Sequence, residues 1–436
     1  MIISFSVKNF YSIKDEITLS FEAIKSNDLS EFYFVKHELE QDLNILKLGL
    51  IYGANASGKT TILKSLSFLR QMVVEPFDKK NEPLSFLPFF FDKASPKSDS
   101  ELSIDFIANG TRYKYKVEFN NTHIVNETLR FFSSAKSSLL YRRKTNPKSQ
   151  LTEIRFGKTL VSRLSKVERD SLQTNTLWNN TVLGGYLKTN ISSKEFHDVS
   201  AWFEKILQPM IEPHNHYNPY TNLTAQISNG IEKNDLLKKA VLEILQKADL
   251  KITNIEVVDR TEETLNIVSS TDTNNTSFFH GRDSSNTKVL QTLFHHTVSG
   301  KTYRLPIELE SDGTVRYYHF AGLLASMVGN SVIYSIDEIA SSLHPDLLKH
   351  FLLTFLANTK TSQLIATTHH RELLKERDIL RDDAIWFTEK KEDGSTDLFS
   401  LTDFDTSVVR DTSSIYNAYK IGKLGAVPEL EDHYID

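Results

Sequence analysis

Short stretches of alternating hydrophobic and polar residues mark the first quarter of the chain. Residues 2–7 alternate, and 102–106 and 112–119 alternate again on either side of Asn109-Gly110, a dipeptide typical of tight hairpin turns. A continuous apolar run occupies 46–52. We expect these stretches to be strands, so the pattern predicts a β-rich N-terminal lobe.

A different periodicity begins at residue 60. Over 60–74 the apolar side chains recur about every 3.6 residues, which places them on one face of a helix. The same criterion predicts helices over 194–207, 234–248, 313–327 and 345–356. Strands are predicted over 289–298, 303–309, 332–336, 363–366 and 384–387, and a loop over 272–286. Because strands and helices alternate in the last third of the chain, we expect a parallel sheet covered by helices there.

The composition removes several classes of chemistry. The chain has 436 residues and no cysteine, which excludes disulfides, thiolate zinc sites and cysteine nucleophiles. No apolar run approaches the roughly 18–20 residues of a membrane helix, and the alternating start does not resemble a signal peptide. We therefore expect a cytoplasmic protein that does not bind a membrane.

One segment departs from the overall charge balance. The net charge of the chain is −5, yet the segment from Lys136 to Arg169 contains ten basic residues and only two acids, Glu153 and Glu168. A solvated face of an insertion would explain the segment, and so would a contact with a nucleic-acid backbone or with an acidic partner. The segment has few aromatic residues, which disfavours a platform for stacking single-stranded bases.

The loop after the apolar run 46–52 carries a phosphate-binding pattern. It fits G-x-x-x-x-G-K-[ST] in full, with the residues Gly53, Ala54, Asn55, Ala56, Ser57, Gly58, Lys59 and Thr60. In such a loop the backbone amides surround a phosphate, the lysine neutralises phosphate oxygens and the hydroxyl binds Mg²⁺. The loop stands between a predicted strand and a predicted helix, which is the context that this motif requires.

An acidic pair follows one of the later predicted strands. The apolar run 332–336 leads directly into Asp337 and Glu338. A strand in this position can deliver the aspartate to a Mg²⁺ ion, and the glutamate can polarise the water that attacks the γ-phosphate of ATP. Alone, the pair could equally be a solvated strand end. Together with the phosphate-binding loop, it indicates an ATP-hydrolysing site.

Four further motifs occur in a fixed order along the chain: Asn9-Phe10-Tyr11-Ser12-Ile13, Glu310-Ser311-Asp312-Gly313-Thr314, Ser341-Ser342-Leu343-His344-Pro345 and Thr367-Thr368-His369. Taken singly, 310–314 could be a helix cap and 341–345 a helix start. Together with the loop and the acidic pair, the set resembles that of the ABC-type ATPases. The chain is most similar to the AAA15-like, RloA-like branch, which is related to the ATPase domains of OLD-family, Rad50 and SMC proteins. The resemblance covers residues 1–130 and 287–436.

The resemblance implies an architecture. The fold class would be α/β, an ABC-type P-loop NTPase with a β-rich N-terminal lobe, a parallel-sheet RecA-like core and a mixed helical insertion. Residues 1–155 and 286–436 would form the ATPase domain in two separated halves. Residues 156–285 would form an inserted, mostly helical accessory domain.

The resemblance also implies roles for single residues. The backbone from Gly53 to Gly58, together with Lys59, Thr60 and Thr61, would bind ATP, and Thr60 and Asp337 would hold Mg²⁺. Glu338 would be the catalytic base, assisted by Lys59 and by His369 as the sensor of the γ-phosphate. Ser311 and Gly313 would reach the ATP bound to a second subunit. The chain departs from the family at His370, where relatives often have an acid, and no glutamine matches the family's Q-loop.

The implied function is that of an ATP-binding and ATP-hydrolysing homodimer or higher oligomer. The RloA-like resemblance implies a nucleotide-gated sensor or controller in bacterial anti-phage defence. It would act on a separately encoded toxic effector, since no nuclease activity is expected in this chain. The alternative is a Rad50- or SMC-like DNA repair or chromosome clamp, against which stand the lack of sustained heptads and of a cysteine pair for a zinc hook. An ABC transporter subunit is disfavoured by the motif at 9–13 and by the long insertion.

Two other patterns are weak candidates for metal sites. His214-Asn215-His216 spells HNH but lacks the spacing of a ββα metal site, and flanking prolines indicate a loop. Asp403-Phe404-Asp405 is better explained as a turn than as a pair of nuclease carboxylates.

Overall fold

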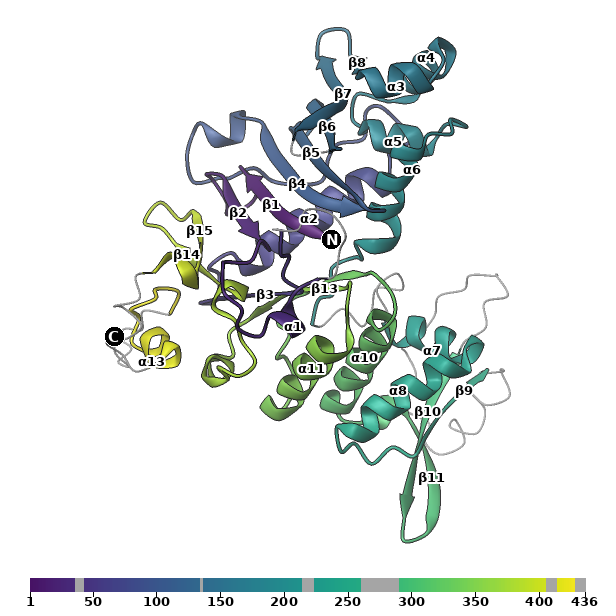
Figure 1. Cartoon of the computed structure of the whole chain (residues 1–436), viewed down its shortest axis with the longest axis vertical. Coiled ribbons are helices and arrows are strands. Elements are labelled where there is room, and N and C mark those ends of the chain that lie inside the picture. Colours follow the sequence, from purple (N-terminus) through teal and green to yellow (C-terminus); the bar gives the residue numbers. More distant parts are fainter. Residues whose placement is uncertain (36–42, 134–135, 214–222, 260–289, 405–413, 428–436) are drawn as a thin grey trace, which may run out of the picture. The chain divides into compact units, whose positions relative to one another are not determined.

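The computed structural model describes residues 1–35, 43–133, 136–213, 223–259, 290–404 and 414–427 (Figure 1). The chain forms two compact units. The first contains Met1–Pro213, Gly329–Ser341 and Leu356–Asp436, and the second contains His214–Val328 and Ser342–Phe355. These bounds differ from the predicted division at residues 155 and 286, which stays a prediction. The predicted loop 272–286 lies outside the described residues.

The first unit contains a seven-stranded antiparallel sheet in the order β2-β1-β4-β5-β6-β7-β8. Its strands are β1 (Ile2–Lys8), β2 (Ile17–Ser20), β4 (Ser100–Ala108), β5 (Thr111–Phe119), β6 (Ile124–Phe132), β7 (Ser137–Asn146) and β8 (Leu151–Phe156). The strands alternate between the two faces, as β5 shows: Tyr113, Tyr115 and Val117 are buried, while the side chains between them are not. The predicted β-rich N-terminal lobe is therefore confirmed, and β4 and β5 lie where the alternation placed them.

The basic segment is not a separate insertion face, contrary to one of its interpretations. Strands β7 and β8 fall within it and pair with β6 in the same sheet. The many cations concealed the alternation of buried and exposed positions that marks these strands. On β7, Arg142 and Lys144 are exposed, whereas Arg143 between them is fully buried.

The second sheet of the first unit has five strands in the order β12-β13-β3-β14-β15. They are β12 (Ile333–Ile336), β13 (Gln363–Thr368), β3 (Leu48–Gly53), β14 (Ile385–Lys390) and β15 (Thr396–Ser400). The first four are parallel, as predicted, and β15 is antiparallel to β14. Every residue of β3 and β13 is buried, as expected for central strands of a sheet covered on both faces.

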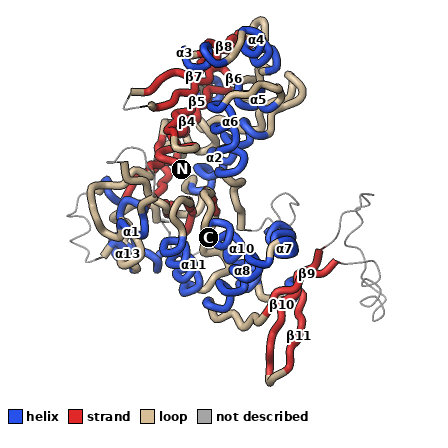
Figure 2. The backbone as a smooth tube through the Cα atoms, turned by 45° about the vertical axis from the view of Figure 1, so that its right-hand side comes forward, coloured by secondary structure: helices blue, strands red, loops and turns tan. Residues whose placement is uncertain are grey.

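Helix α2 (Lys59–Val74) follows β3 and contacts both β3 and β1, so it connects the two sheets of the first unit (Figure 2). The unit also contains α1 (Ser30–Tyr33), α3 (Lys158–Arg163), α4 (Lys166–Asn175), α5 (Val182–Leu187), α6 (Lys194–Ala201) and α13 (Ile415–Lys420). The helix predicted over 194–207 is α6 continued by a π-helical turn, Trp202–Ile206.

The second unit places helices against a three-stranded sheet in the order β11-β10-β9. Its elements are α7 (Leu223–Lys233), α8 (Asp235–Lys247), β9 (Asn254–Asp259), β10 (Leu290–Val298), β11 (Lys301–Pro306), α10 (Asp312–Met327) and most of α11 (Pro345–Asn358). The strand predicted over 303–309 ends early, at Pro306, and Ile307–Leu309 is a 3-10 turn. Proline has no amide hydrogen with which to continue a ladder. Within the described residues, no helix is both long enough and apolar enough to cross a membrane.

A buried ion pair fixes the far end of the seven-stranded sheet. Glu127 on β6 accepts hydrogen bonds from the hydroxyls of Tyr115 (2.9 Å) and Tyr141 (2.6 Å) and from the amide of Val182 (2.8 Å). Arg143 Nη1 lies 3.7 Å from this carboxylate, and both side chains are fully buried. Burial lowers the pKa of Arg143 to about 10, and Glu127 acts in the opposite direction. Each charge is therefore tolerated here because the other is present.

We predict that Arg143→Met destabilises the first unit by about 3–5 kcal/mol, because it leaves the Glu127 carboxylate buried without its cation. The neighbouring substitution Arg142→Met is the matched control, since Arg142 points to solvent and should leave the transition unchanged. Urea unfolding followed by circular dichroism measures both. Equal midpoints for the two variants would contradict the assignment of Arg143 to this pair.

Candidate functional site

The loop between β3 and α2 has the conformation that its glycines and small residues allow. Ala56 and Gly58 both have positive φ, 63° and 108°, and the side chain of Thr396 fills the space that a Cβ on Gly58 would need. Helix α2 begins at Lys59, so the amides of Lys59 and Thr60 have no intrahelical acceptor. Such amides at a helix N-terminus favour an anion.

Lys59 is folded back against its own loop. Its Nζ donates hydrogen bonds to the carbonyl oxygens of Gly53 (2.9 Å) and Ala54 (3.0 Å), and the side chain is 5% exposed. Burial lowers the pKa of Lys59, while the carboxylates of Glu338 and Asp337 act in the opposite direction. A cation is thus held at the mouth of the loop, close to two carboxylates.

Thr60 and Asp337 meet although 277 residues separate them in the sequence. The Thr60 hydroxyl donates to both carboxylate oxygens of Asp337, at 3.1 and 2.9 Å. Thr367, at the end of β13, donates to Oδ1 of the same carboxylate. Asp337, only 7% exposed, is therefore fixed by two hydroxyl groups, one from the first turn of α2 and one from the end of β13.

Glu338 follows in a strained backbone conformation with φ of 47°. Its amide donates to Thr367 Oγ1 (2.9 Å), and its carboxylate lies 2.6 Å from His369 Nδ1 and 3.9 Å from Lys59 Nζ. The structure thus distinguishes between the two adjacent histidines, because His369 meets the glutamate. His370 instead donates its amide to Thr368, and burial is the main cause that lowers its pKa.

The chemistry of Thr60 and Asp337 fits a Mg²⁺ ion. Both present oxygen atoms, which this hard cation prefers, and Mg²⁺ in phosphate-transfer sites is held by one or two carboxylates together with substrate phosphates. Within the described residues, no group of three or more His, Cys, Asp and Glu side chains forms a metal cage. The weak HNH pattern at 214–216 and Asp405 lie outside the described residues, while Asp403 forms a capping box with Ser400.

A set of hydroxyl groups supports the phosphate-binding loop from behind. Ser57 Oγ lies 2.6 Å from Thr388 Oγ1 on β14, and Thr396 Oγ1 on β15 donates to the Ser57 carbonyl oxygen at 2.9 Å. Ser12 Oγ lies 2.9 Å from Thr396 Oγ1 and 3.2 Å from Thr61 Oγ1. Three remote segments therefore hold one short loop in place.

Of these hydroxyls, those of Ser57 and Thr61 were predicted to belong to the ATP site and Ser12 was a member of a quoted motif, whereas Thr388 and Thr396 were not predicted. Thr388 and Thr396 stand in an ordinary strand pattern that gives no local signal of a role. Their function depends on pairing between strands, since Tyr52 on β3 lies opposite Phe387 on β14. Only the three-dimensional structure brings them to the loop.

The motif at 9–13 has a structural role that its residues explain. Asn9 and Tyr11 both have positive φ, so the chain turns sharply after β1. The Asn9 side chain donates to the carbonyl oxygens of Ser95 and Ser98 (both 2.9 Å) and accepts from the amide of Phe89 (3.0 Å). The turn therefore orders a neighbouring loop and places Ser12 against the phosphate-binding loop.

Ser311 and Gly313 belong to the second unit, so the structure does not group them with the residues above. Ser311 is the N-cap of α10, and its Oγ accepts from the amide of Thr314 at 3.1 Å. Glu310 beside it lies 2.6 Å from His296 Nε2. A Cβ on Gly313 would lie 3.1 Å from the carbonyl oxygen of Ser342, so the helix start packs closely against Ser342.

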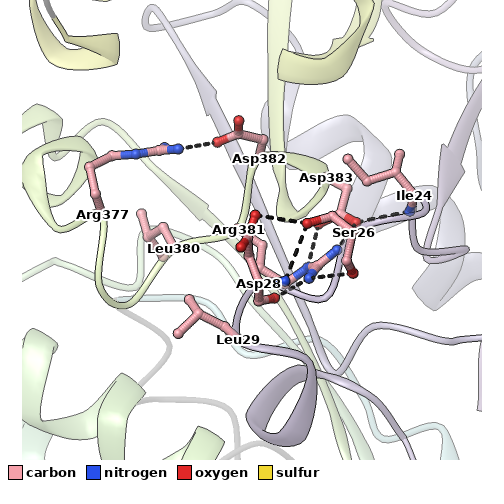
Figure 3. Close-up of a pocket in the computed structure, with 9 residues that line it drawn as sticks. All are labelled: Ile24, Ser26, Asp28, Leu29, Arg377, Leu380, Arg381, Asp382 and Asp383. Atoms are coloured by element: carbon pink, nitrogen blue, oxygen red, sulfur yellow. Dashed lines mark hydrogen bonds and ion pairs between the residues drawn. The ribbon is translucent and has the colours of Figure 1, made fainter.

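Another concavity of the first unit, of about 310 Å³, lies between residues 24–29 and 377–383 (Figure 3). Arg381 is buried there and donates to both carboxylate oxygens of Asp383, at 2.9 and 2.7 Å. Asp383 also accepts from the amide of Ile24 (3.0 Å), and Arg381 donates to the carbonyl oxygen of Asp28. Because these groups form hydrogen bonds with one another, we interpret the concavity as the place where two chain segments are held together.

One protein family matches most of the chain. The profile described as "AAA domain, putative AbiEii toxin, Type IV TA system" aligns with residues 50–375, more than half of the 436 residues. The aligned span includes Lys59, Asp337, Glu338 and His369. No curated protein matches the chain.

Several solved structures are similar to the chain at low sequence identity. The SMC head bound to the C-terminal winged-helix domain of ScpA is 14% identical, covers 92% of this chain and 97% of its own, and has a TM-score of 0.45. The SMC head domain from Thermotoga maritima is 14% identical, with coverage of 92% and 98% and a TM-score of 0.40. The SMC head with an extended coiled coil, bound to the C-terminal domain of ScpA from Pyrococcus furiosus, is 12% identical, with coverage of 97% and 98% and a TM-score of 0.40.

The family match and the topology agree with each other. A phosphate-binding loop follows the central strand of a parallel sheet, and an acidic pair follows the strand at its edge. The chain belongs to the AAA-domain family described by that profile, and its fold is α/β with a parallel sheet.

Proposed function

We propose that this protein binds and hydrolyses ATP at the cluster of Lys59, Thr60, Asp337, Glu338 and His369. The observation that carries the proposal is the convergence of these five side chains within the first unit. The Thr60–Asp337 hydrogen bonds and the Glu338–His369 contact span 2.6 to 3.1 Å. No other group of described residues combines a phosphate-binding loop with carboxylates.

Each residue would act through its position. The amides of 53–60 and Lys59 would bind the β- and γ-phosphates. For this, Lys59 would have to break its hydrogen bonds to the carbonyl oxygens of Gly53 and Ala54. Glu338 would orient the attacking water. His369, which contacts Glu338 directly, would sense the γ-phosphate. Mg²⁺, held by Thr60 and Asp337, would neutralise charge that develops on the phosphates.

The proposed assembly is a homodimer that closes on ATP. Ser311 and Gly313 begin a 16-residue helix, whose N-terminus favours an anion. In the proposed dimer this end would face the γ-phosphate bound to the partner subunit. The site would then be complete only after dimerisation, and hydrolysis would reopen it.

We further propose that the ATPase is a nucleotide-gated controller in bacterial anti-phage defence, acting on a separately encoded effector. The support is the resemblance to the RloA-like branch and the description of the matching family, which names a toxin of a type IV TA system. A controller of this kind transmits its state to a partner protein.

We predict that Glu338→Gln retains ATP binding but lowers turnover by at least about 100-fold, because the amide cannot accept a proton from water. Lys59→Ala should lose both binding and turnover. Lys64→Ala is the matched control, since Lys64 is exposed on the same helix. The Glu338→Gln protein should also become a dimer when ATP and Mg²⁺ are added. Phosphate release measures turnover, a nucleotide-binding assay measures ATP binding, and light scattering measures dimerisation. Full turnover in either site variant would refute the assignment.

The controller role predicts a partner. The tagged Glu338→Gln protein, expressed from its native gene neighbourhood and held with ATP and Mg²⁺, should retain a neighbouring-gene protein in a fixed ratio. The Lys59→Ala protein should not. Mass spectrometry of the purified material decides the point. Retention of nucleic acid without any protein would favour the clamp instead.

The hydroxyl set behind the loop predicts a positioning effect of Thr396. Thr396→Val keeps the shape of the side chain but removes the hydrogen bond to the Ser57 carbonyl oxygen, so we expect the KM for ATP to rise about tenfold with kcat changed less than about threefold. Thr396→Ser should restore the wild-type KM. If the valine variant lowers kcat and leaves KM unchanged, Thr396 does not act through the loop.

A further inference from the structure

The outer face of the seven-stranded sheet carries aligned cations on neighbouring strands. Lys116 on β5 lies opposite Thr128 on β6, which lies opposite Arg142 on β7, which lies opposite Arg155 on β8. These four side chains form one row across the strands, about 14 Å long at the usual strand separation. Each of them points away from the core, because the residues next to them in sequence are buried.

Two directly opposite pairs on this face have the same charge. Arg142 faces Arg155, and in the adjacent row Lys114 on β5 faces Arg130 on β6. Like charges at directly opposite positions destabilise a sheet. Solubility alone does not require like charges at directly opposite positions. A polyanion that bound to both pairs would neutralise their charges and remove the repulsion.

The acids of this face are already engaged. Lys116 pairs with Glu101 (2.7 Å), Arg155 with Glu153 (3.0 Å) and Arg112 with Asp105 (2.9 Å). Within the described residues, no acid pairs with Lys114, Arg130, Arg142 or Lys144. Asp105 lies opposite Lys114 and Glu153 lies opposite Lys144. Since these two acids pair with Arg112 and Arg155, the four cations on three adjacent strands have no ion pair of their own among the described residues.

This set differs from the basic segment seen in the sequence. Of the cations between 136 and 169, Arg143 is buried beneath the sheet and Arg163 pairs with Glu195 on α6. Lys114 and Arg130 on β5 and β6 lie outside that segment and join the face. The charged face of the sheet therefore excludes some cations of the segment 136–169 and includes others that lie outside it.

The geometry points to double-stranded DNA as the occupant of this face. Cations two residues apart on a strand, such as Arg142 and Lys144, are separated by about 6.8 Å, which equals the rise of two nucleotides along the axis of B-form DNA. Thr128 lies between Lys116 and Arg142, and hydroxyls are frequent partners of phosphates. No aromatic side chain interrupts the row, so the face is suited to a duplex backbone rather than to stacking of single-stranded bases.

We propose that the face formed by Lys114, Lys116, Arg130, Arg142, Lys144 and Arg155 binds the phosphate backbone of a DNA duplex without reading its sequence. This inference goes beyond the proposed ATPase and controller function and is independent of it. The net charge of the chain is −5, so the protein as a whole does not attract DNA. The proposed binding is therefore confined to this face.

The test is fluorescence anisotropy with a labelled DNA duplex of about 30 base pairs and mixed sequence, in the absence of nucleotide. Arg142→Gln/Lys144→Gln should weaken binding by on the order of 50-fold at 0.1 M salt, as the counterions of two phosphates imply. The slope of log K against log salt should become shallower by about 2. Lys158→Gln/Lys166→Gln removes the same charge from exposed positions at the starts of α3 and α4 and should leave both quantities nearly unchanged.

Several outcomes would overturn the proposal. They are absence of duplex binding by the wild-type chain, equal losses in both double variants, and equal competition by a single strand, an RNA duplex or phosphatidylserine vesicles. Circular dichroism establishes that both variants are folded. The ATPase rate without DNA should stay at the wild-type value in both, so a failure of DNA binding and a failure of the ATPase assignment give different results.

Discussion

The parallel pairing of β12, β13 and β3 is the constraint on which the candidate site depends. Because Ile336 lies opposite Ala366 and Thr368 lies opposite Tyr52, the three strands end at the same edge of the sheet. The chain leaving β3 becomes the phosphate-binding loop, the chain leaving β12 supplies Asp337 and Glu338, and the chain leaving β13 supplies His369. Thr367 connects the last two, since its hydroxyl contacts the Asp337 carboxylate and accepts the Glu338 amide. No residue needs to reach across the sheet, because the register already brings the groups together.

The charged groups at this edge already have polar partners. Lys59 donates to carbonyl oxygens of its own loop, and Glu338 is held by His369. A bound nucleotide would have to replace the first set of contacts, and water would have to reach the second. Both replacements exchange one polar partner for another, so neither leaves a buried charge uncompensated. The arrangement explains how a buried lysine can remain compatible with a stable fold while keeping its charge available to phosphates.

The parts that the sequence predicted are those in which the information is local. The loop 53–60, the pair Asp337 and Glu338, and the helices that follow them are contiguous patterns with a fixed chemical reason for each residue. Strands β7 and β8 were missed because a run of cations hid the two-residue alternation, and nothing in the order Arg142-Arg143-Lys144 tells which arginine turns inward. Glu127 decides that, and it lies on another strand. The supporting hydroxyls of Thr388 and Thr396 were missed for a similar reason, because Ser57 is 331 residues away from Thr388 in the sequence.

The two sheets of the first unit are connected at both ends of β1, and one of these connections involves residues that support the loop 53–60. Gln363, at the start of β13, accepts from the amide of Ile2 (2.6 Å) and donates to its carbonyl oxygen (2.9 Å). At the other end of β1, the chain turns at Asn9 and Ser12 reaches Thr61 and Thr396. The antiparallel sheet is thus fixed to the parallel sheet at both ends of its strand β1. Since the second of these connections is made through the residues that support the loop, the loop conformation depends on both sheets, and neither sheet alone determines it.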